Sequence, residues 1–519
     1  MNEWERFIDF INNNQQELWT QVGEHLWLTL VSLFISTVVG LSLGIMISKV
    51  TKVSGLVLGV VNAVQTIPSV ALLGFLLPFF GIGVVPAIVA LFLYGLLPIV
   101  RNTYSGITNV DPAVKEAAVG MGLDRRQVLV QVELPLAAPV IFAGIRTAFV
   151  INVGVATLCA LIAAGGLGVF IFRGLSTNNV YMILAGAIPA GLMALFFDAV
   201  LGWIQRHVYQ LKKPLIGLAL LAIGFVSYQW ISPAKKAKVV AGLPSEFVER
   251  EDGYPGLKET YDLDLEVMEM EIGLMYKAVK NGNVDVISGF STDGRIEAFD
   301  LFILEDDKRY FPPYHAAPLV RLETLDRYPQ LYAAFEKISG NITDQEMSRL
   351  NYLVDEEQED ITGVAKNFLL EKGLKATVSR SGEPDIVIGS KNFTESFLLA
   401  EMFKLLIENY TSLTVELKLG FGGTKLLFDA MQQGFIDIYP EYTGTGLLVI
   451  LKPGEAVIKD ILYEKEVVLN YVKDNFREKY GLQWLDPLGF NNTHAFMMRR
   501  EDAERLGITK ISDLAASSD

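Results

Sequence analysis

Cysteine and histidine are scarce in this chain of 519 residues. Cys159 is the single cysteine, so one chain can form neither an internal disulfide bond nor a zinc site built on several thiolates. The histidines lie far apart along the sequence, at His25, His207, His315 and His494, without the spacing of metal ligands. We therefore predict no metal site and no bound cofactor.

Phosphate-binding and catalytic motifs are missing as well. The stretch Gly420–Lys425 contains the glycines and the lysine of a Walker A loop, but not at the required spacing. The glycines around residues 165–168 have no strand–helix unit about them, so they are no dinucleotide-binding motif. The other motifs bring together no Ser/His/Asp set and no pair of carboxylates, so we predict no catalytic residue. The chain is not expected to be an enzyme or to hydrolyse ATP itself.

Charge is distributed unevenly between the two halves of the chain. Residues 1–238 contain 15 Lys and Arg against 10 Asp and Glu, with long runs free of charge. Residues 239–519 contain 29 Lys and Arg against 49 Asp and Glu. This contrast predicts a membrane domain followed by an acidic soluble domain that is large enough for two lobes. We interpret the acidic surface as a solvated face and expect no nucleic-acid partner.

Six segments of the first half are apolar over about 20 residues, the length of a transmembrane helix. They are residues 26–47, 56–80, 84–100, 140–163, 181–204 and 214–231. Residues 1–25 are too long and too acidic for the start of a signal peptide, so we expect the first span to be retained. The sequence predicts an all-α domain with six membrane spans.

Basic residues between these spans indicate how the domain is oriented in the membrane. They follow the first, third and fifth spans, at Lys49, Lys52, Arg101, Lys115, Arg125, Arg126, Arg206, Lys212 and Lys213. Because Lys and Arg accumulate on the cytoplasmic side, the N-terminus and the whole second half are expected outside the cell. The cluster Lys235, Lys236 and Lys238 breaks this rule locally. We predict a multi-pass protein of the bacterial plasma (inner) membrane.

A charged segment between the third and fourth spans is longer than a simple connection requires. Its apolar residues Val119, Leu123, Val128 and Val132 favour short amphipathic helices on the inner face of the membrane domain. The glycines at 120 and 122 permit a tight turn between two such helices, and Pro135 is expected to end the second one. On these features alone, an ordinary loop helix would also fit.

From residue 239 onward, short apolar runs alternate with helical segments, which is typical of an α/β fold. We predict strands at 239–243, 284–290, 385–389, 414–419 and 436–439. We predict helices at 273–281, 394–409 and 425–433. Residues 375–385 are polar and contain Gly, Ser and Pro, so we interpret them as a linker.

The charged segment resembles a motif of one transporter family. Glu116-Ala117-Ala118, Gly122 and Leu134-Pro135 stand at the spacing of the EAA loop of importer-type ATP-binding cassette (ABC) permeases, with Val132 where the family has Ile. This resemblance implies a type I importer-like permease over residues 26–212, with the EAA loop at 111–135. It also implies that the loop docks on a separate cytoplasmic ATPase and that two copies of the chain pair in the membrane lipid.

Several stretches of the second half resemble the substrate-binding proteins of osmoprotectant importers, which take up glycine betaine, carnitine and choline. They are Gly389–Ser396 (GSKNFTES), Glu441–Gly446 (EYTGTG), Phe490–Thr493 (FNNT), Glu249–Tyr254 (EREDGY) and Phe311–Tyr314 (FPPY). The resemblance implies a two-lobe α/β domain like a type II periplasmic binding protein. Such a domain closes on its ligand between the lobes.

The order of these motifs differs from that of the family. Residues 239–374 match its C-terminal half and residues 386–519 its N-terminal half, which suggests a circular permutation joined at 375–385. Residues 213–238 would then form the sixth span and the tether. The alternative is that one lobe is a degenerate remnant of a binding domain.

The same resemblance implies a set of ligand-binding residues. The family holds a quaternary ammonium in a cage of four tyrosines, because aromatic faces attract such cations. The matching positions are Tyr442, Tyr314, Phe290 and His494, and only the first two are tyrosine. Partners for a ligand carboxylate would be Lys391, Arg250 and Thr445, with Asn492 as a polar wall.

Taken together, the resemblances imply the permease and substrate-binding subunit of an ATP-driven importer for quaternary ammonium compatible solutes, such as glycine betaine, carnitine or choline. The changed cage leaves an ergothioneine importer open, and an amino-acid importer is a further alternative. A membrane receptor that senses ligand would have no need of the EAA loop, so we rank it last. The expected partners are the ATPase, a second copy of the chain, the small-molecule ligand and membrane lipid.

Overall fold

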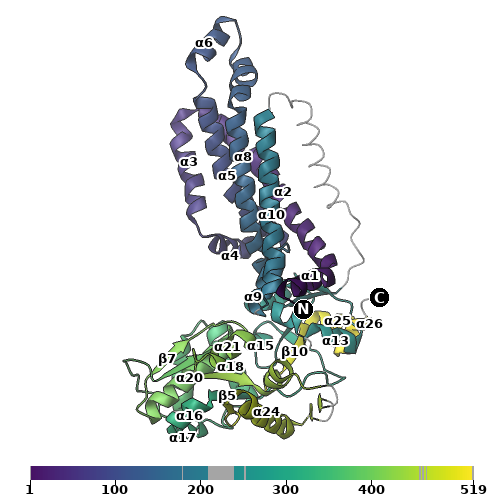
Figure 1. Cartoon of the computed structure of the whole chain (residues 1–519), viewed down its shortest axis with the longest axis vertical. Helices are drawn as coiled ribbons and strands as arrows, with labels where there is room; N and C mark the ends of the chain where they lie inside the picture. The colour runs from purple at the N-terminus through teal and green to yellow at the C-terminus, as the bar shows by residue number, and fades with distance from the viewer. Residues whose placement is uncertain are drawn as a thin grey trace. The chain divides into compact units, whose positions relative to one another are not determined.

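The computed structural model describes residues 2–177, 179–207, 239–250, 253–454, 457–458, 461–462 and 464–516. The chain divides into two compact units, one comprising 1–175 with 179–237 and the other comprising 176–178 with 238–519. We call them the membrane unit and the binding unit (Figure 1). The predicted sixth span and its tether lie outside the described residues.

Four long helices form the body of the membrane unit: α2 (Gln15–Lys49), α5 (Val84–Thr108), α8 (Leu134–Leu158) and α10 (Val180–His207). Each is long and apolar enough to cross a membrane, which confirms the first, third, fourth and fifth predicted helices. Small residues let these helices pack closely. A Cβ atom added at Gly40 would lie 2.8 Å from Ile99, and one added at Gly144 would lie 2.6 Å from the carbonyl oxygen of Pro98.

The second predicted span, residues 56–80, is formed by two helices that meet at a break. Its two parts, α3 (Thr51–Thr66) and α4 (Ser69–Phe80), meet at an angle of 101°. Pro68 causes the break, because a proline disfavours helical backbone at the residue before it, and Ile67 is extended. The hydroxyl of Tyr94 donates a hydrogen bond to the carbonyl oxygen of Ile67 and thereby satisfies a group that the break exposes.

Short helices occupy one end of the membrane unit, where Figure 1 shows α6. This coupling segment, residues 111–135, comprises α6 (Pro112–Gly120), α7 (Arg125–Gln127) and the π-helix η1 (Val128–Glu133). The prediction that Pro135 ends a helix is wrong, because the helical run continues from Arg125 to Ile162. Pro135 lies in the first turn of α8, directly after the π-helix η1. Near the other end of the unit lie α1 (Glu3–Asn13) and α9 (Gly168–Ser176).

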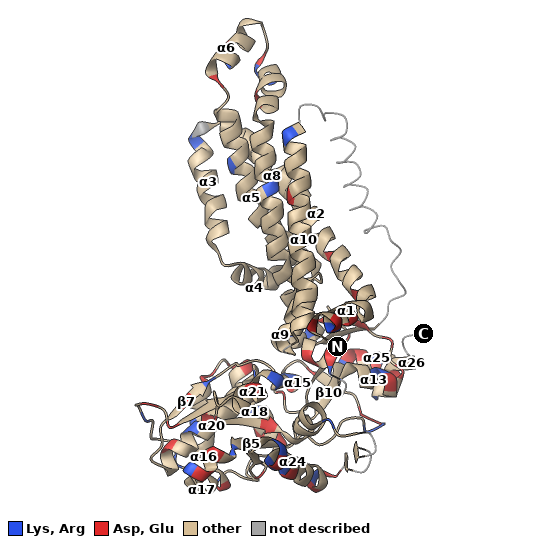
Figure 2. Cartoon of the chain, in the orientation of Figure 1, with Lys and Arg blue, Asp and Glu red and all other residues tan. Residues whose placement is uncertain are grey.

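Lys and Arg residues of the membrane unit are concentrated toward the end that carries α6 (Figure 2). Acidic residues occupy the first turn of α1, near the opposite end. This distribution agrees with the predicted orientation, in which the α6 end faces the cytoplasm.

Two five-stranded sheets form the binding unit. The first sheet has the order β2 (Glu266–Glu269), β1 (Val240–Leu243), β3 (Val286–Phe290), β10 (His494–Arg499), β4 (Leu301–Ile303). The second has the order β7 (Val415–Lys418), β6 (Ile386–Gly389), β8 (Ile438–Tyr442), β5 (Ala316–Arg321), β9 (Leu482–Trp484). In each sheet four strands run in the same direction, and one strand, β10 in the first sheet and β5 in the second, runs antiparallel to both of its neighbours. All five predicted strands are confirmed, and their observed ends lie within three residues of the predicted ends.

Helices around the two sheets complete a first and a second lobe. The first lobe contains α12 (Ser245–Glu249), α13 (Tyr254–Tyr261), α14 (Ile272–Lys280), α15 (Arg295–Ala298), α25 (Arg500–Leu506) and α26 (Ile511–Ala516). The second contains α16 (Leu322–Arg327), α17 (Gln330–Glu336), α18 (Asp344–Asp355), α19 (Ile361–Glu371), α20 (Thr394–Tyr410), α21 (Thr424–Gln432), α22 (Thr443–Thr445), η3 (Gly446–Leu451) and α24 (Lys465–Tyr480). The predicted helices at 273–281, 394–409 and 425–433 correspond to α14, α20 and α21.

The chain passes between the lobes twice, once between β4 and β5 and once between β9 and β10. As a result, β5 joins strands that lie later in the sequence, and β10 joins strands that lie earlier. Neither 239–374 nor 386–519 builds a lobe by itself. Both stretches contribute strands to both sheets, which argues against a degenerate remnant.

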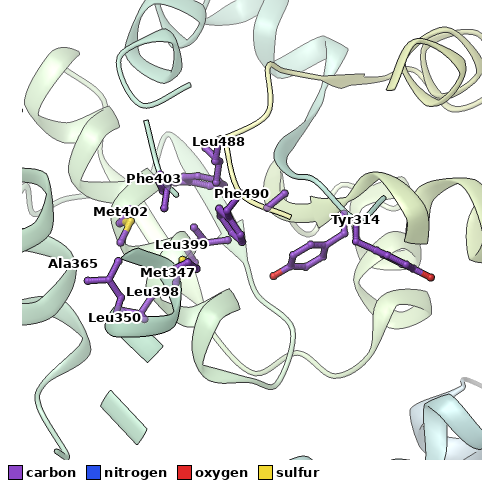
Figure 3. Close-up of a cluster of buried hydrophobic side chains, with 14 of the residues drawn as sticks. Tyr314, Met347, Leu350, Ala365, Leu398, Leu399, Met402, Phe403, Leu488 and Phe490 are labelled. Carbon is purple, nitrogen blue, oxygen red and sulfur yellow. The ribbon is translucent and has the colours of Figure 1, made fainter. Parts of the chain in front are cut away.

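Helix α20 is the centre of the second lobe and carries the candidate site at its N-terminus. Leu398, Leu399, Met402 and Phe403 project from it into a buried cluster with residues of α18 and with Phe490 (Figure 3). A helix that is apolar on nearly all sides is held on all sides by its neighbours. The core therefore fixes the position of the polar residues in the first turn of α20.

Candidate functional site

A buried carboxylate lies where the two lobes meet. Glu395, in the first turn of α20, accepts hydrogen bonds from the hydroxyls of Thr292 and Tyr442, both at 2.6 Å. It also accepts bonds from the side-chain amides of Asn492 at 2.8 Å and Asn351 at 3.1 Å. Thr292 follows β3 in the first lobe, whereas Tyr442 ends β8 in the second. Glu395 thus links the lobes through side chains that bear no charge.

Burial controls the ionisation of this group. Desolvation raises the pKa of Glu395 above its usual value of 4.5, although all four hydrogen bonds act in the opposite direction. Burial also raises the pKa of the Tyr442 hydroxyl, with the carboxyl of Glu395 as the next cause. The neighbourhood therefore disfavours an additional negative charge.

Aromatic rings from both lobes form a continuous row next to Glu395. Phe290, at the end of β3, stacks on Phe393, which precedes α20, with ring centroids 5.5 Å apart and planes at 22°. His494 lies 5.2 Å from Phe290 and meets Tyr314 edge-on at 5.2 Å. Tyr442 lies 6.3 Å from Phe393. This aromatic row, Tyr314–His494–Phe290–Phe393–Tyr442, contains all four positions that the family resemblance identified.

Three rings of this region were missed in the sequence. Phe393 is part of the row, while Phe247 and Phe311 pack on His494 at centroid distances of 5.0 and 5.5 Å. Phe393 and Phe311 lie inside the GSKNFTES and FPPY stretches. These two motifs are the sequence signal by which both rings could be identified.

The two basic residues expected to bind a ligand carboxylate already have acidic partners. Lys391 donates to Glu441 at 2.6 Å, both side chains being buried, and its ammonium lies 5.1 Å from the ring centroid of Tyr442. Arg250 pairs with Glu246 at 3.5 Å. Thr445 is buried in α22.

A small cavity opens between the lobes beside Glu395. It is lined by Phe290, Thr292, Asn351, Phe393, Glu395 and Asn492, and farther out by Ile272, Asp293, Arg295, Asp355 and Thr394. The space open to the centre of a water molecule is about 20 Å³, which is room for about one water. Of the predicted ligand residues, Phe290 and Asn492 line this cavity, whereas the other six do not. The lobes are thus closed on each other, and a trimethylammonium group can enter only when they part.

An ion pair joins the lobes at the same cavity. Arg295 of α15 bonds to Asp293 at 2.6 and 2.8 Å and lies 3.4 Å from Asp355 at the end of α18. Asp355 also accepts a 2.5 Å bond from the hydroxyl of Thr394. Burial raises the pKa of Asp355, which Arg295 and Thr394 oppose. No local sequence pattern signals the contact between Arg295 and Asp355, because these residues are far apart in the chain.

The coupling segment presents an exposed surface at its end of the membrane unit. Helix α6 begins at Pro112, and the side chain of the preceding Asp111 accepts a hydrogen bond from the backbone N–H of Ala113. Glu116 and Ala117 are exposed, Ala118 is buried, and the apolar residues Val119 and Met121 are 61% and 75% exposed. Gly122 has a φ of +88°, a backbone conformation that favours glycine, and allows the turn after α6. Leu134 and Pro135 lie in the first turn of α8.

A buried glutamate ties this segment to the long helices. Glu133, at the end of η1, pairs with Lys49 at the end of α2 and lies 3.7 Å from Lys115 of α6. Lys115 also donates to the carbonyl oxygen of Ile107 in α5 at 3.1 Å. These contacts connect α6 to α2 and α5.

Comparison with known families agrees with both halves of the chain. Residues 36–213 match the family described as the binding-protein-dependent transport system inner membrane component. Residues 231–371 and 384–519, together more than half of the chain, match the substrate binding domain of ABC-type glycine betaine transport systems.

Individual relatives match the permease half along nearly all of their own length. A glycine betaine/carnitine/choline transport system permease protein of Bacillus subtilis is 42% identical over 39% of this chain and 94% of the relative. A choline transport system permease protein of the same species is 42% identical over 39% of this chain and 93% of the relative. A carnitine transport permease protein of Listeria monocytogenes is 40% identical over 41% of this chain and 98% of the relative. The chain therefore belongs to the ABC-type importers with binding-protein-dependent inner-membrane components, and it joins such a permease to a substrate-binding domain of the glycine betaine type.

Proposed function

We propose that this chain is the permease and substrate-binding subunit of an ATP-driven importer for quaternary ammonium osmoprotectants. The observation that carries the proposal is the aromatic row, which joins rings of both lobes beside the buried carboxylate of Glu395. A quaternary ammonium has no N–H to donate, so aromatic faces suit it, each contributing about 0.5–2 kcal/mol. The names of the relatives, which include glycine betaine, carnitine and choline transport, support this ligand class.

The residues at the matched family positions take defined roles in this proposal. Tyr314, Tyr442, Phe290 and His494 face the ammonium once the lobes open, and Phe393 adds a ring. Asn492 and Thr445 are the polar contacts, and Lys391 and Arg250 reach a ligand only when they leave Glu441 and Glu246. Lobe closure around the cation then replaces the direct contact between Phe290 and Phe393.

The membrane half takes the coupling role. Exposed residues of α6, including Glu116, Ala117 and the apolar pair Val119 and Met121, form the surface that docks on the separate ATPase. Two copies of the chain pair to enclose the pathway, and lipid covers the remaining apolar helix faces. Residues 213–238 complete the membrane domain and tether the binding unit outside. Tethering keeps the binding unit at high local concentration near the pathway.

Binding by the purified full-length chain in lipid nanodiscs tests the proposal. Calorimetry against choline, glycine betaine, carnitine, ergothioneine and proline should show saturable binding of at least one of the first three. Binding of proline alone would replace the proposal with amino-acid import, and binding of ergothioneine alone would replace it with ergothioneine import. Uptake into proteoliposomes should additionally require the ATPase and ATP, since a sensor would bind without transport.

A further inference from the structure

Two amide side chains at the cavity each leave an oxygen without a hydrogen-bond partner. Asn492 donates through Nδ2 to Glu395, and Asn351 donates through Nδ2 to Glu395 and to the carbonyl oxygen of Thr292. These partners are all acceptors, so the nitrogen of each amide must face them. The Oδ1 atoms of both residues are buried and have no partner among the residues that the structure describes. Both side chains line the cavity and are at least 96% buried.

The hydroxyl donors of the cavity wall, in contrast, already have acceptors. The hydroxyl of Thr292 donates to Glu395, and that of Thr394 donates to Asp355. The guanidinium of Arg295 is held by Asp293 and lies near Asp355. Among the described hydroxyl and amide side chains of the wall, the atoms without a partner are therefore acceptors. A buried acceptor without a partner is costly, so this site favours a ligand that brings a donor.

A ligand carboxylate would find the opposite conditions. It would add acceptor oxygens beside Glu395, Asp293 and Asp355, all of which line the cavity. Lys391 and Arg250, which could compensate it, do not line the cavity and have Glu441 and Glu246 as partners. Binding a carboxylate here would require breaking such pairs.

We propose that Asn351, Glu395 and Asn492, the acceptor cluster, determine the specificity of this cleft by selecting a cationic ligand that bears a hydroxyl donor over one that bears a carboxylate. The ligand class is thus a quaternary amino alcohol rather than a betaine. This inference rests on the proposed function, because the aromatic row must first accept the quaternary ammonium. The hydroxyl then donates to the free Oδ1 atoms, and Glu395 supplies the charge that faces the cation.

The decisive comparison uses ligands that share the trimethylammonium group. Choline carries a hydroxyl, glycine betaine carries a carboxylate, and tetramethylammonium carries neither. With the full-length chain in nanodiscs, choline should bind at least tenfold more tightly than either of the others. Equal or tighter binding of glycine betaine, or equal binding of tetramethylammonium, would overturn the inference while leaving the proposed function intact. Absence of binding for all three, and for carnitine as well, would overturn the proposed function itself.

A substitution tests the residues directly. Glu395→Gln replaces one acceptor oxygen with a donor in a side chain of the same size and should lower the choline-to-betaine affinity ratio at least tenfold. Glu401→Gln is the matched control, because Glu401 is also buried in α20 but does not line the cavity. A merely structural role of Glu395 would weaken both ligands equally, and an unchanged ratio contradicts the assignment. If Glu395→Gln fails to fold, the ligand series on the unaltered chain still decides.

Discussion

Glu133 in the membrane unit and Glu395 in the binding unit are both glutamates with almost no exposed surface, 4% and 2% respectively. Their partners differ. Glu133 pairs with two lysines, Lys49 and Lys115, whereas the partners of Glu395 are two hydroxyls and two amides. A buried charge with partners of opposite sign is compensated inside the chain. A buried carboxylate with only uncharged donors leaves its charge available for a cation from outside.

The contrast separates two tasks. The ion pairs of Glu133 connect α6, η1 and α2, so they transmit movement within the membrane unit. The hydrogen bonds of Glu395 connect the two lobes and face a cavity, so they serve recognition and closure. A change at the first residue should affect transport more than binding, and a change at the second should affect binding.

Removing part of the coupling segment should have the largest effect, and it should affect transport without affecting binding. Deletion of residues 116–122 removes the exposed part of α6 and the turn at Gly122. We expect ATP-driven uptake into proteoliposomes to fall to background, while calorimetry shows ligand affinity unchanged within error. Residual uptake near the wild-type rate would refute the docking role of α6.

Tyr442 allows the ring and the hydroxyl of the binding unit to be separated. Tyr442→Ala removes a buried ring and should cost about 3–5 kcal/mol of folding free energy and abolish binding of quaternary amines. Tyr442→Phe keeps the ring but deprives Glu395 of one donor, which should cost about 1–3 kcal/mol. Denaturant unfolding and calorimetry measure both. Equal losses for the two variants would show that the ring itself contributes nothing.

The sequence predicts those parts of this molecule that depend on local pattern. Strands β1, β3 and β6 and four of the long membrane helices follow from runs of apolar residues, which are visible without knowledge of the fold. The break at Pro68 was visible as a proline, but its angle of 101° depends on the surrounding helices. Strands β2, β4, β5, β9 and β10 were not predicted, and of these β4 and β9 have only three residues, which carry too little pattern.

Glu395 could not have been identified from the sequence alone. It stands in a quoted motif, but its importance comes from Thr292, Asn351, Tyr442 and Asn492, which lie up to 103 residues away in the chain. Only the fold brings these groups together. The aromatic positions, in contrast, were accessible through family motifs, since each motif places its ring at a strand end.

Closure of the lobes can be opposed at a single glycine. A Cβ atom added at Gly294, beside α15, would lie 2.5 Å from the backbone nitrogen of Tyr352 in α18, which belongs to the other lobe. Gly294→Ala should therefore shift the lobes toward the open form and weaken ligand binding about tenfold, or about 1.4 kcal/mol.

Gly273→Ala in α14 is the control for this variant, since an added Cβ there meets no atom within 4 Å. Calorimetry compares affinities, and small-angle scattering of the full-length chain reports closure on ligand. Wild-type affinity in Gly294→Ala would show that the contact with α18 does not limit closure.

Glu133→Gln tests whether the ion pairs of the membrane unit affect transport without affecting ligand binding. It keeps the shape of the side chain but removes the charge that attracts Lys49 and Lys115. Because these lysines are partly exposed, removing the ion pairs should weaken the connection between α6 and α2 by about 1 kcal/mol. If this connection limits transport, the uptake rate should fall about fivefold, the factor that corresponds to this energy. Ligand affinity should not change, and an altered affinity would contradict the separation of tasks between the two glutamates.

The smallest effect should be the pH dependence of the ligand-free protein. Because burial raises the pKa of Glu395 above 4.5 in the folded state, folding favours the protonated carboxyl. The associated stability is fully present below the unfolded pKa and is lost as pH rises through the folded pKa. Glu395→Gln imitates the protonated group at every pH, so its stability relative to wild type should increase as pH rises from 4.5. Thermal unfolding of both proteins at successive pH values measures this difference, and a saturating cationic ligand should reduce it by favouring the carboxylate. A difference in stability that does not change with pH would mean that the neutral donors around Glu395 stabilise its carboxylate enough to cancel the effect of burial.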